Sequence, residues 1–152
     1  AIEGLKCDTA VHICYGYGIK ANTDWKQTLG SEWRQYEAIF PKLQQSAIDM
    51  VSLECHNSRV PMELIELIRG KKVMVGAIDV ATHQIETPEQ VAETLHKALQ
   101  FVDAENLYPC TNCGMAPLPR HVAQGKLSAL AQGAKLVRND YLATHQLDDL
   151  II

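Results

Sequence analysis

The run "KVMVGAID", residues 72–79, is apolar almost without interruption and ends in a carboxylate. Such a run is typical of a strand that is covered on both faces, as the strands of parallel sheets are. Three further runs share this character: "TAVHICY" (9–15), "DMVSLEC" (49–55) and "NLYPCTN" (106–112). The sequence therefore predicts four short strands spread along its length.

Helical segments separate and follow these runs. The segment 61–70 begins with proline and ends with glycine, which is the usual punctuation of a helix. The segment 87–102 opens with Thr-Pro-Glu, which predicts an N-cap at Thr87. Its predicted apolar face consists of Val91, Leu95, Leu99 and Val102.

Two longer segments, 23–47 and 119–143, also have helical periodicity. In the first, Gly30 and Pro41 predict a break into two or three pieces. The predicted apolar residues are Trp33, Tyr36, Ile39, Phe40 and Leu43 in the first segment, and Val122, Leu127, Leu130 and Leu136 in the second.

A strand-helix alternation repeated four times predicts an α/β fold with a parallel sheet, in one domain over residues 1–152. Two architectures fit: a small doubly wound sheet, or half of an eight-unit (β/α) barrel, whose full length is about 250 residues. A half-barrel would leave two sheet edges unpaired. In that case we expect the other strands to come from a missing N-terminal half or from a partner chain.

The composition excludes several classes of protein. With 47% hydrophobic and 21% charged residues, the chain reads as one globular domain without a membrane span or signal peptide. A net charge of −4 without a basic cluster gives no reason to expect nucleic acid as a partner. Five cysteines are an odd number, which favours metal-binding or catalytic thiols in a reducing, cytoplasmic setting over a disulfide framework.

Each predicted strand delivers a polar side chain at its carboxyl end. His12 and Cys14 are two residues apart and so project to the same face, Glu54 and Asp79 end the next two strands, and "CTNCG" (110–114) follows the last. In parallel α/β folds these ends converge on the active site.

The set His12, Cys14, Glu54 and Cys113 offers the nitrogen, sulfur and oxygen ligands that zinc takes in tetrahedral geometry. Ordinary interpretations remain open for its members. Cys14 and His12 are also compatible with core positions, and Cys110 with Cys113 is compatible with a redox pair. His56 is an alternative ligand, although we expect it to be a solvated loop residue.

These residues resemble the C-terminal catalytic barrel of the cobalamin-independent methionine synthases. The motifs that carry the resemblance are "HICYG" (12–16), "VSLECHNSR" (51–59), "GAIDVATH" (76–83) and "TNCGM" (111–115). Their order, spacing and strand context match together over almost the whole chain. The resemblance implies the last four β-α units of a TIM (β/α)8 barrel.

The resemblance places the zinc ligands on His12, Cys14, Glu54 and Cys113. Cys113 is preferred to Cys110 because glycine and an aliphatic residue follow it. The implied reaction is methyl transfer to the sulfur of homocysteine, giving methionine. Zinc would deprotonate the thiol, while Glu54 loosens as the substrate sulfur enters.

One departure concerns the methyl donor. The family usually has a histidine two residues after the aspartate that matches Asp79, where this chain has Ala81, and the next histidine is His83. We expect Asp79 and His83 as the catalytic pair if His83 substitutes for that histidine in protonating a folate leaving group. Otherwise the departure favours a shorter relative that accepts its methyl group from a methylcorrinoid rather than from methyltetrahydrofolate.

Two other functions are compatible with the same residues. The first is a non-enzymatic α/β module with a structural zinc, whose closed coordination would resist an added thiol. The second is a metal-free relative of the decarboxylases built on this barrel, against which the histidine and paired cysteines argue.

Overall fold

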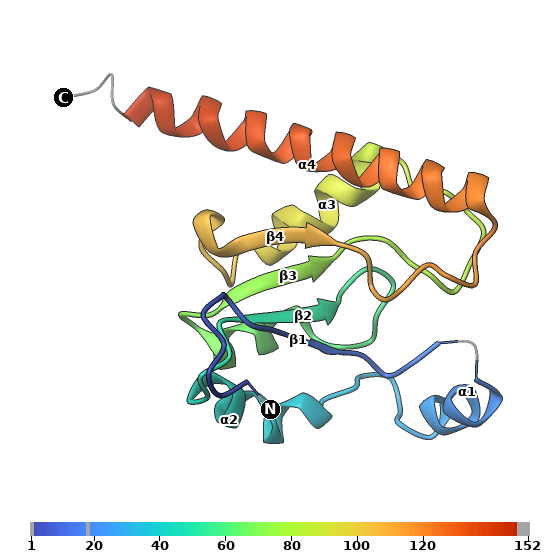
Figure 1. Cartoon of the computed structure of the whole chain (residues 1–152). Coiled ribbons are helices and arrows are strands. Elements are labelled where there is room, and N and C mark those ends of the chain that lie inside the picture. The colour runs from blue at the N-terminus through green and yellow to red at the C-terminus, as the bar shows by residue number, and fades with distance from the viewer. Residues whose placement is uncertain (1, 18, 149–152) are drawn as a thin grey trace.

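The computed structural model describes residues 2–17 and 19–148, and of residues 145–148 only the backbone. Four parallel strands form one sheet in sequence order (Figure 1): β1 (Ala10–Ile13), β2 (Met50–Glu54), β3 (Lys72–Gly76) and β4 (Leu107–Cys110). The predicted α/β class with parallel β-α units is confirmed. Because each strand lies beside the next one in sequence, the order is that of a barrel segment rather than of a doubly wound sheet, whose order reverses at a switch point.

Helices fill the connections, as predicted. They are α1 (Lys20–Gln27), the 3-10 helix η1 (Gln35–Ala38), α2 (Phe40–Gln44), the 3-10 helix η2 (Met62–Ile68), α3 (Pro88–Ala98), the 3-10 helix η3 (Ala104–Asn106) and α4 (Arg120–Asp148). The segment 23–47 is broken as expected, but Pro41 lies in the first turn of α2 and starts that helix rather than ending one. Thr87 caps α3 through a reciprocal pair of bonds with Gln90.

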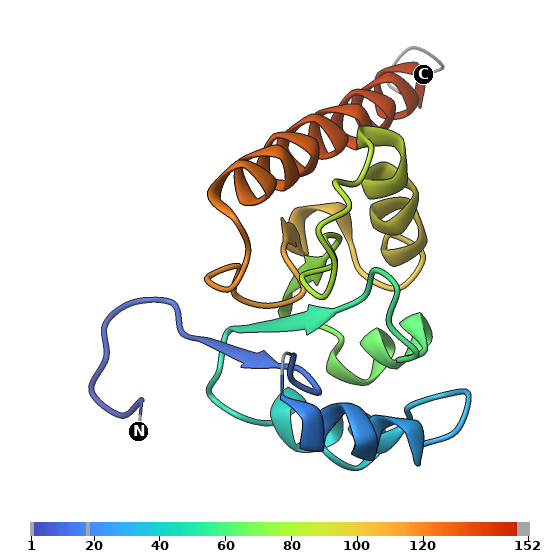
Figure 2. The same ribbon diagram turned by 90° about the vertical axis from the view of Figure 1, so that its right-hand side faces the viewer.

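The two faces of the sheet differ in what covers them. In β2 and β3, Val51, Leu53, Val73 and Val75 are buried in the hydrophobic core beneath the helices. Figure 2 shows η2 and α3 on the same side of the sheet, with the N-terminal segment on the other side. Side chains alternate along a strand, so the residues between those core positions lie on the face away from these helices. That face carries the polar side chains.

The long helix α4 buries only part of the predicted face, with Leu130 packed against the core as expected. Val122 is buried as expected, but Leu127 is 49% exposed and Leu136 is 38% exposed. The reason is Lys126, which is fully buried and donates to both carboxylate oxygens of Glu86 at 3.0 Å. Turning this ammonium inward turns the two leucines outward. Among the described residues no helix, α4 included, is both long and apolar enough to cross a bilayer.

The buried ion pair predicts the effect of Lys126→Met. The substitution would leave the Glu86 carboxylate buried and unpaired, and we expect the free energy of unfolding in urea to fall by about 3–5 kcal/mol. Lys97→Met, which removes an exposed i,i+4 pair with Glu93, should cost less than about 1 kcal/mol. Adding Glu86→Gln to Lys126→Met should restore part of the loss. Equal effects of Lys126→Met and Lys97→Met would contradict this account.

Candidate metal centre

Three potential ligands meet at the carboxyl ends of the two outer strands. His12 lies in β1, Cys14 one residue beyond it, and Cys113 in the loop after β4. One ligand atom from each lies within 4.8 Å of the others, and the two sulfur atoms are 3.8 Å apart. Cys14 and Cys113 are 99 positions apart in sequence and are brought together here, as expected for side chains at the carboxyl ends of parallel strands.

The loop after β4 reaches across the sheet to make this meeting. β1 and β4 are three strands apart, which at the usual spacing is about 14 Å. Asn112, which is 1% exposed, closes this distance by bonding to the ends of β2 and β3. Its backbone N–H donates to the carbonyl of Ile78 at 2.9 Å, and its side-chain amide donates to the carbonyl of His56 at 2.8 Å. Its side-chain oxygen accepts from the N–H of Cys55 at 3.2 Å.

Gly76 makes room for Asn112. A Cβ atom at position 76 would lie 2.5 Å from the side-chain oxygen of Asn112 and 2.6 Å from the carbonyl oxygen of Leu53. Any larger residue would therefore push the loop off the tip of β3 and move Cys113 with it. Neither role was predicted from the sequence. The available signal was a glycine inside a strand run, which marks a close approach of another backbone.

Ser52 orients His12. The Ser52 hydroxyl lies 2.9 Å from Nδ1 of His12, its neighbour in the β1–β2 register. Metal-binding histidines usually hold their second ring nitrogen in such a bond, which leaves the other nitrogen for the ion. Cys110 lies outside the cluster, with its sulfur 3.9 Å from the same hydroxyl, and burial raises the pKa of its thiol to about 11. Burial also raises the pKa of the Cys14 thiol.

Glu54 is buried beside the cluster but does not belong to it. The carboxylate is 2% exposed, and it is absent from the group of ligand atoms that lie within 4.8 Å of one another. One carboxylate oxygen accepts from the backbone N–H of Tyr15 at 2.8 Å, and the other accepts from the hydroxyl of Tyr17 at 2.5 Å. Three members of the predicted tetrad are thus together, and the fourth is held by the segment that carries Cys14.

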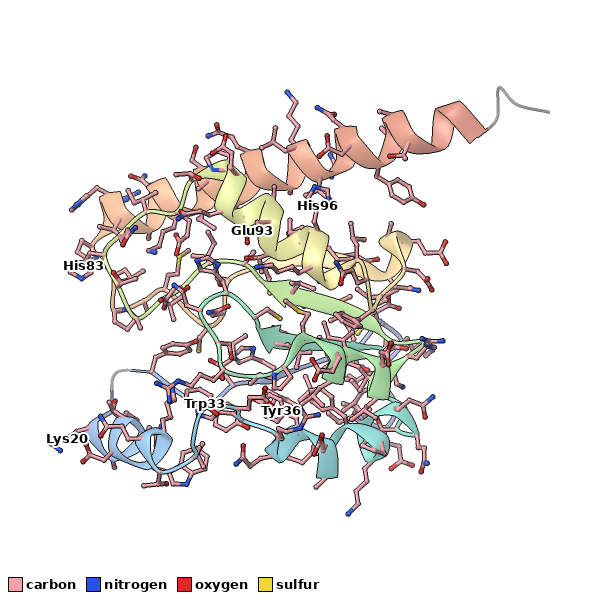
Figure 3. All side chains as sticks on the ribbon, turned by 180° about the vertical axis from the view of Figure 1, so that it is seen from behind. Lys20, Trp33, Tyr36, His83, Glu93 and His96 are labelled. Atoms are coloured by element: carbon pink, nitrogen blue, oxygen red, sulfur yellow. The ribbon has the colours of Figure 1, made fainter. Side chains whose placement is uncertain are left out.

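Asp79 and His83 have different surroundings. The Asp79 carboxylate accepts from the N–H of Ala81 at 2.8 Å and from the side chain of Asn57 at 3.3 Å, while its own N–H donates to Glu86 at 2.9 Å. His83 is exposed, and Figure 3 shows it at the outer edge of the loop between β3 and α3. Neither residue belongs to the three-residue cluster.

His56 is half-buried, with its ring 3.0 Å from the hydroxyl of Thr94 on α3. It lies in a loop as expected, and this hydrogen bond holds the half-buried ring against the helix. It lies outside the cluster as well.

The donor set of the cluster fits zinc. One imidazole and two thiols are among the ligands that tetrahedral zinc sites use. Two thiolates about 2.3 Å from one ion at the tetrahedral angle are about 3.8 Å apart. The sulfur atoms of Cys14 and Cys113 are 3.8 Å apart, so both could bind the same ion without moving relative to each other.

Comparison with known proteins identifies the family of the chain. A family model described as the catalytic domain of the cobalamin-independent synthases matches residues 18–136. The chain belongs to this family. The matched segment includes Glu54 and Cys113, whereas His12 and Cys14 precede it.

Individual relatives cover nearly all of the chain. Proteins named methionine synthase from Saccharolobus islandicus (strain Y.G.57.14 / Yellowstone #1) and Sulfurisphaera tokodaii are each 29% identical to it, over 143 and 142 residues. The solved structure of a B12-independent methionine synthase from Shewanella sp. W3-18-1, in complex with selenomethionine, is 77% identical, with a TM-score of 0.90 over 93% of this chain.

The chain spans only part of these proteins. It covers 37% and 36% of the two curated relatives and 42% of the Shewanella chain. The similarity therefore establishes the family and the local fold, and the matched region is one part of a larger enzyme in each relative.

Asn112 provides a test of how the cluster is assembled. Asn112→Ala would remove the partner of the His56 carbonyl and one partner of the Cys55 N–H, so we expect a loss of about 2 kcal/mol in urea unfolding. We also expect weaker zinc binding in a chelator competition, because Cys113 adjoins the released residue. Asn139→Ala, on the exposed surface of α4, is the control. Unchanged zinc affinity in Asn112→Ala would show that Cys113 is positioned by other contacts.

Proposed function

We propose that the chain forms the last four β-α units of a methionine-synthase-type barrel, which transfers a methyl group to the sulfur of homocysteine and gives methionine. The observation that carries the proposal is the convergence of His12, Cys14 and Cys113 at the sheet's carboxyl edge. The names of the relatives support the reaction. The Shewanella structure contains selenomethionine, the selenium analogue of the proposed product.

Each residue of the predicted tetrad has a proposed role. His12, Cys14 and Cys113 would hold the zinc, with Ser52 fixing the ring of His12. Glu54 would be the fourth ligand, and as a carboxylate among softer ligands it would give way to the substrate sulfur. When bound, the zinc would lower the pKa of the incoming thiol so that it reacts as the thiolate.

The methyl donor divides the proposal into two cases. A folate leaves as a nitrogen base that needs a proton, and Asp79 and His83 are the residues we propose for supplying it. A corrinoid leaves without taking a proton. His83 is exposed at the outer edge of its loop, and Ala81 stands where the family's histidine is expected. Both observations favour a donor that requires no proton.

The cellular setting follows from the thiols. The described cysteines are all free, and a zinc site built on two of them is stable only where thiols stay reduced. We therefore propose a cytoplasmic location.

Metal analysis tests the proposed centre. The intact protein, purified under reducing conditions without chelator, should contain about one zinc per chain. Loss of a hydrogen bond to a metal-binding side chain typically weakens metal affinity about 10–100-fold, so loss of a ligand itself in Cys113→Ser or His12→Ala should weaken it by about 100-fold or more. Cys7→Ser removes an exposed cysteine away from the cluster and should have no effect. A metal-free wild type, or equal losses in all three variants, would refute the centre.

A methyl-transfer assay tests the reaction and the donor. We expect the intact protein to form methionine from homocysteine with either methyltetrahydrofolate or a methylcorrinoid. If folate is the donor, His83→Ala should lower kcat by about 100-fold or more, because general acid catalysis typically contributes that much. With a methylcorrinoid the same variant should keep its rate. His96→Ala, in an exposed pair with Asp140, controls for loss of a surface histidine.

A further inference from the structure

Both oxygens of the Glu54 carboxylate are bound by the segment that follows Cys14. The N–H of Tyr15 donates to one oxygen at 2.8 Å, and the hydroxyl of Tyr17 donates to the other at 2.5 Å. Hydrogen bonds to a charged group are stronger than neutral ones. Each oxygen of this buried carboxylate thus has a protein donor that is not itself a ligand of the cluster.

The position of Tyr17 is fixed by α1 rather than by the metal ligands. Gly16 has a left-handed conformation with φ of 80°, and a side chain there would collide with Asn22. Lys26 donates to the carbonyl of Gly16, and its ammonium lies 4.5 Å from the centre of the Tyr17 ring. This cation–π contact from Lys26 of α1 holds the Tyr17 ring in place. The phenol is therefore aimed at Glu54 before any substrate arrives.

We infer that Tyr17 is a positioning residue. When a substrate thiol replaces Glu54 on the metal, the Tyr17 hydroxyl and the Tyr15 amide together would bind the released Glu54 carboxylate. The inference rests on the proposed zinc centre. A carboxylate that leaves a metal inside a buried site would otherwise be unpaired, which is costly. By binding it, these two donors shift the competition between Glu54 and the thiol toward the thiol.

The test is Tyr17→Phe in the intact protein loaded with Co²⁺, whose visible absorption reports ligand exchange. Without the hydroxyl, Glu54 should stay on the metal, so Co²⁺ affinity in the absence of thiol should be unchanged or higher. Homocysteine binding, followed by the same absorption, should weaken about tenfold, or about 1.4 kcal/mol. Tyr108→Phe, which removes a partly exposed phenol from β4, should change neither quantity.

Two further variants separate positioning from general support of the fold. In a Glu54→Gln background, Tyr17→Phe should no longer change homocysteine affinity, because the charged partner is gone. Replacing Tyr17 by 3-fluorotyrosine keeps the shape of the ring and makes the hydroxyl a stronger donor. Homocysteine affinity should then rise rather than fall. This variant also covers the case in which Tyr17→Phe does not fold.

The outcomes distinguish this inference from the proposed function. A wild type that binds no Co²⁺, or whose absorption ignores homocysteine, refutes the metal centre and the inference with it. A responsive wild type with unchanged homocysteine affinity in Tyr17→Phe overturns the inference alone. So does a variant that loses Co²⁺ affinity with and without thiol, since that result is expected of a merely structural residue.

Discussion

The close approach of Asn112 to Gly76 is the contact on which the arrangement of the centre depends. A parallel sheet keeps its first and fourth strands about 14 Å apart, and side chains alone cannot bridge that distance at ligand-bond lengths. The loop after β4 solves this by lying on the tip of β3, where the absence of a side chain at Gly76 leaves room. The Asn112 side chain then forms hydrogen bonds with the backbone of Cys55 and His56, just beyond the end of β2. Cys113 follows directly and comes within 3.8 Å of Cys14.

The segment around Cys14 serves the core and the site at once. Val11 and Ile13 pack against the hydrophobic core, while His12 and Cys14 belong to the ligand cluster. Tyr15 then turns its ring into an aromatic group, with ring centres 4.8 Å from Trp33 and 5.0 Å from Tyr36. Both partners are marked in Figure 3 below the sheet. The packing of the Tyr15 ring thus fixes the backbone that positions the neighbouring ligand Cys14.

Local patterns predicted the elements and part of the site. Largely apolar runs predicted the strands, and the position of His12, Cys14 and Cys113 at strand ends predicted their meeting, because parallel strands bring their carboxyl ends to one edge. Glu54 ended its strand as predicted, yet its hydrogen bonds to Tyr15 and Tyr17 had no local signature.

On α4, Leu127 and Leu136 were predicted to lie on the apolar face but are exposed, for a similar reason. Periodicity places leucines inside and lysine outside, and nothing near Lys126 in sequence announces a partner 40 residues earlier. Asn112 and Ser52 were missed likewise, since each acts through a tertiary hydrogen bond that only the folded chain creates.

The enclosed ammonium of Lys126 also limits how α4 can be seated. A helix held by aliphatic contacts alone can often be repacked in a slightly rotated setting at modest cost. Here a rotation would withdraw a charge from Glu86, whose carboxylate also receives the backbone N–H of Asp79. Rotation of α4 would therefore also disturb Asp79 in the loop that follows β3. The ion pair between Lys126 and Glu86 thus links the orientation of α4 to the carboxyl end of the sheet.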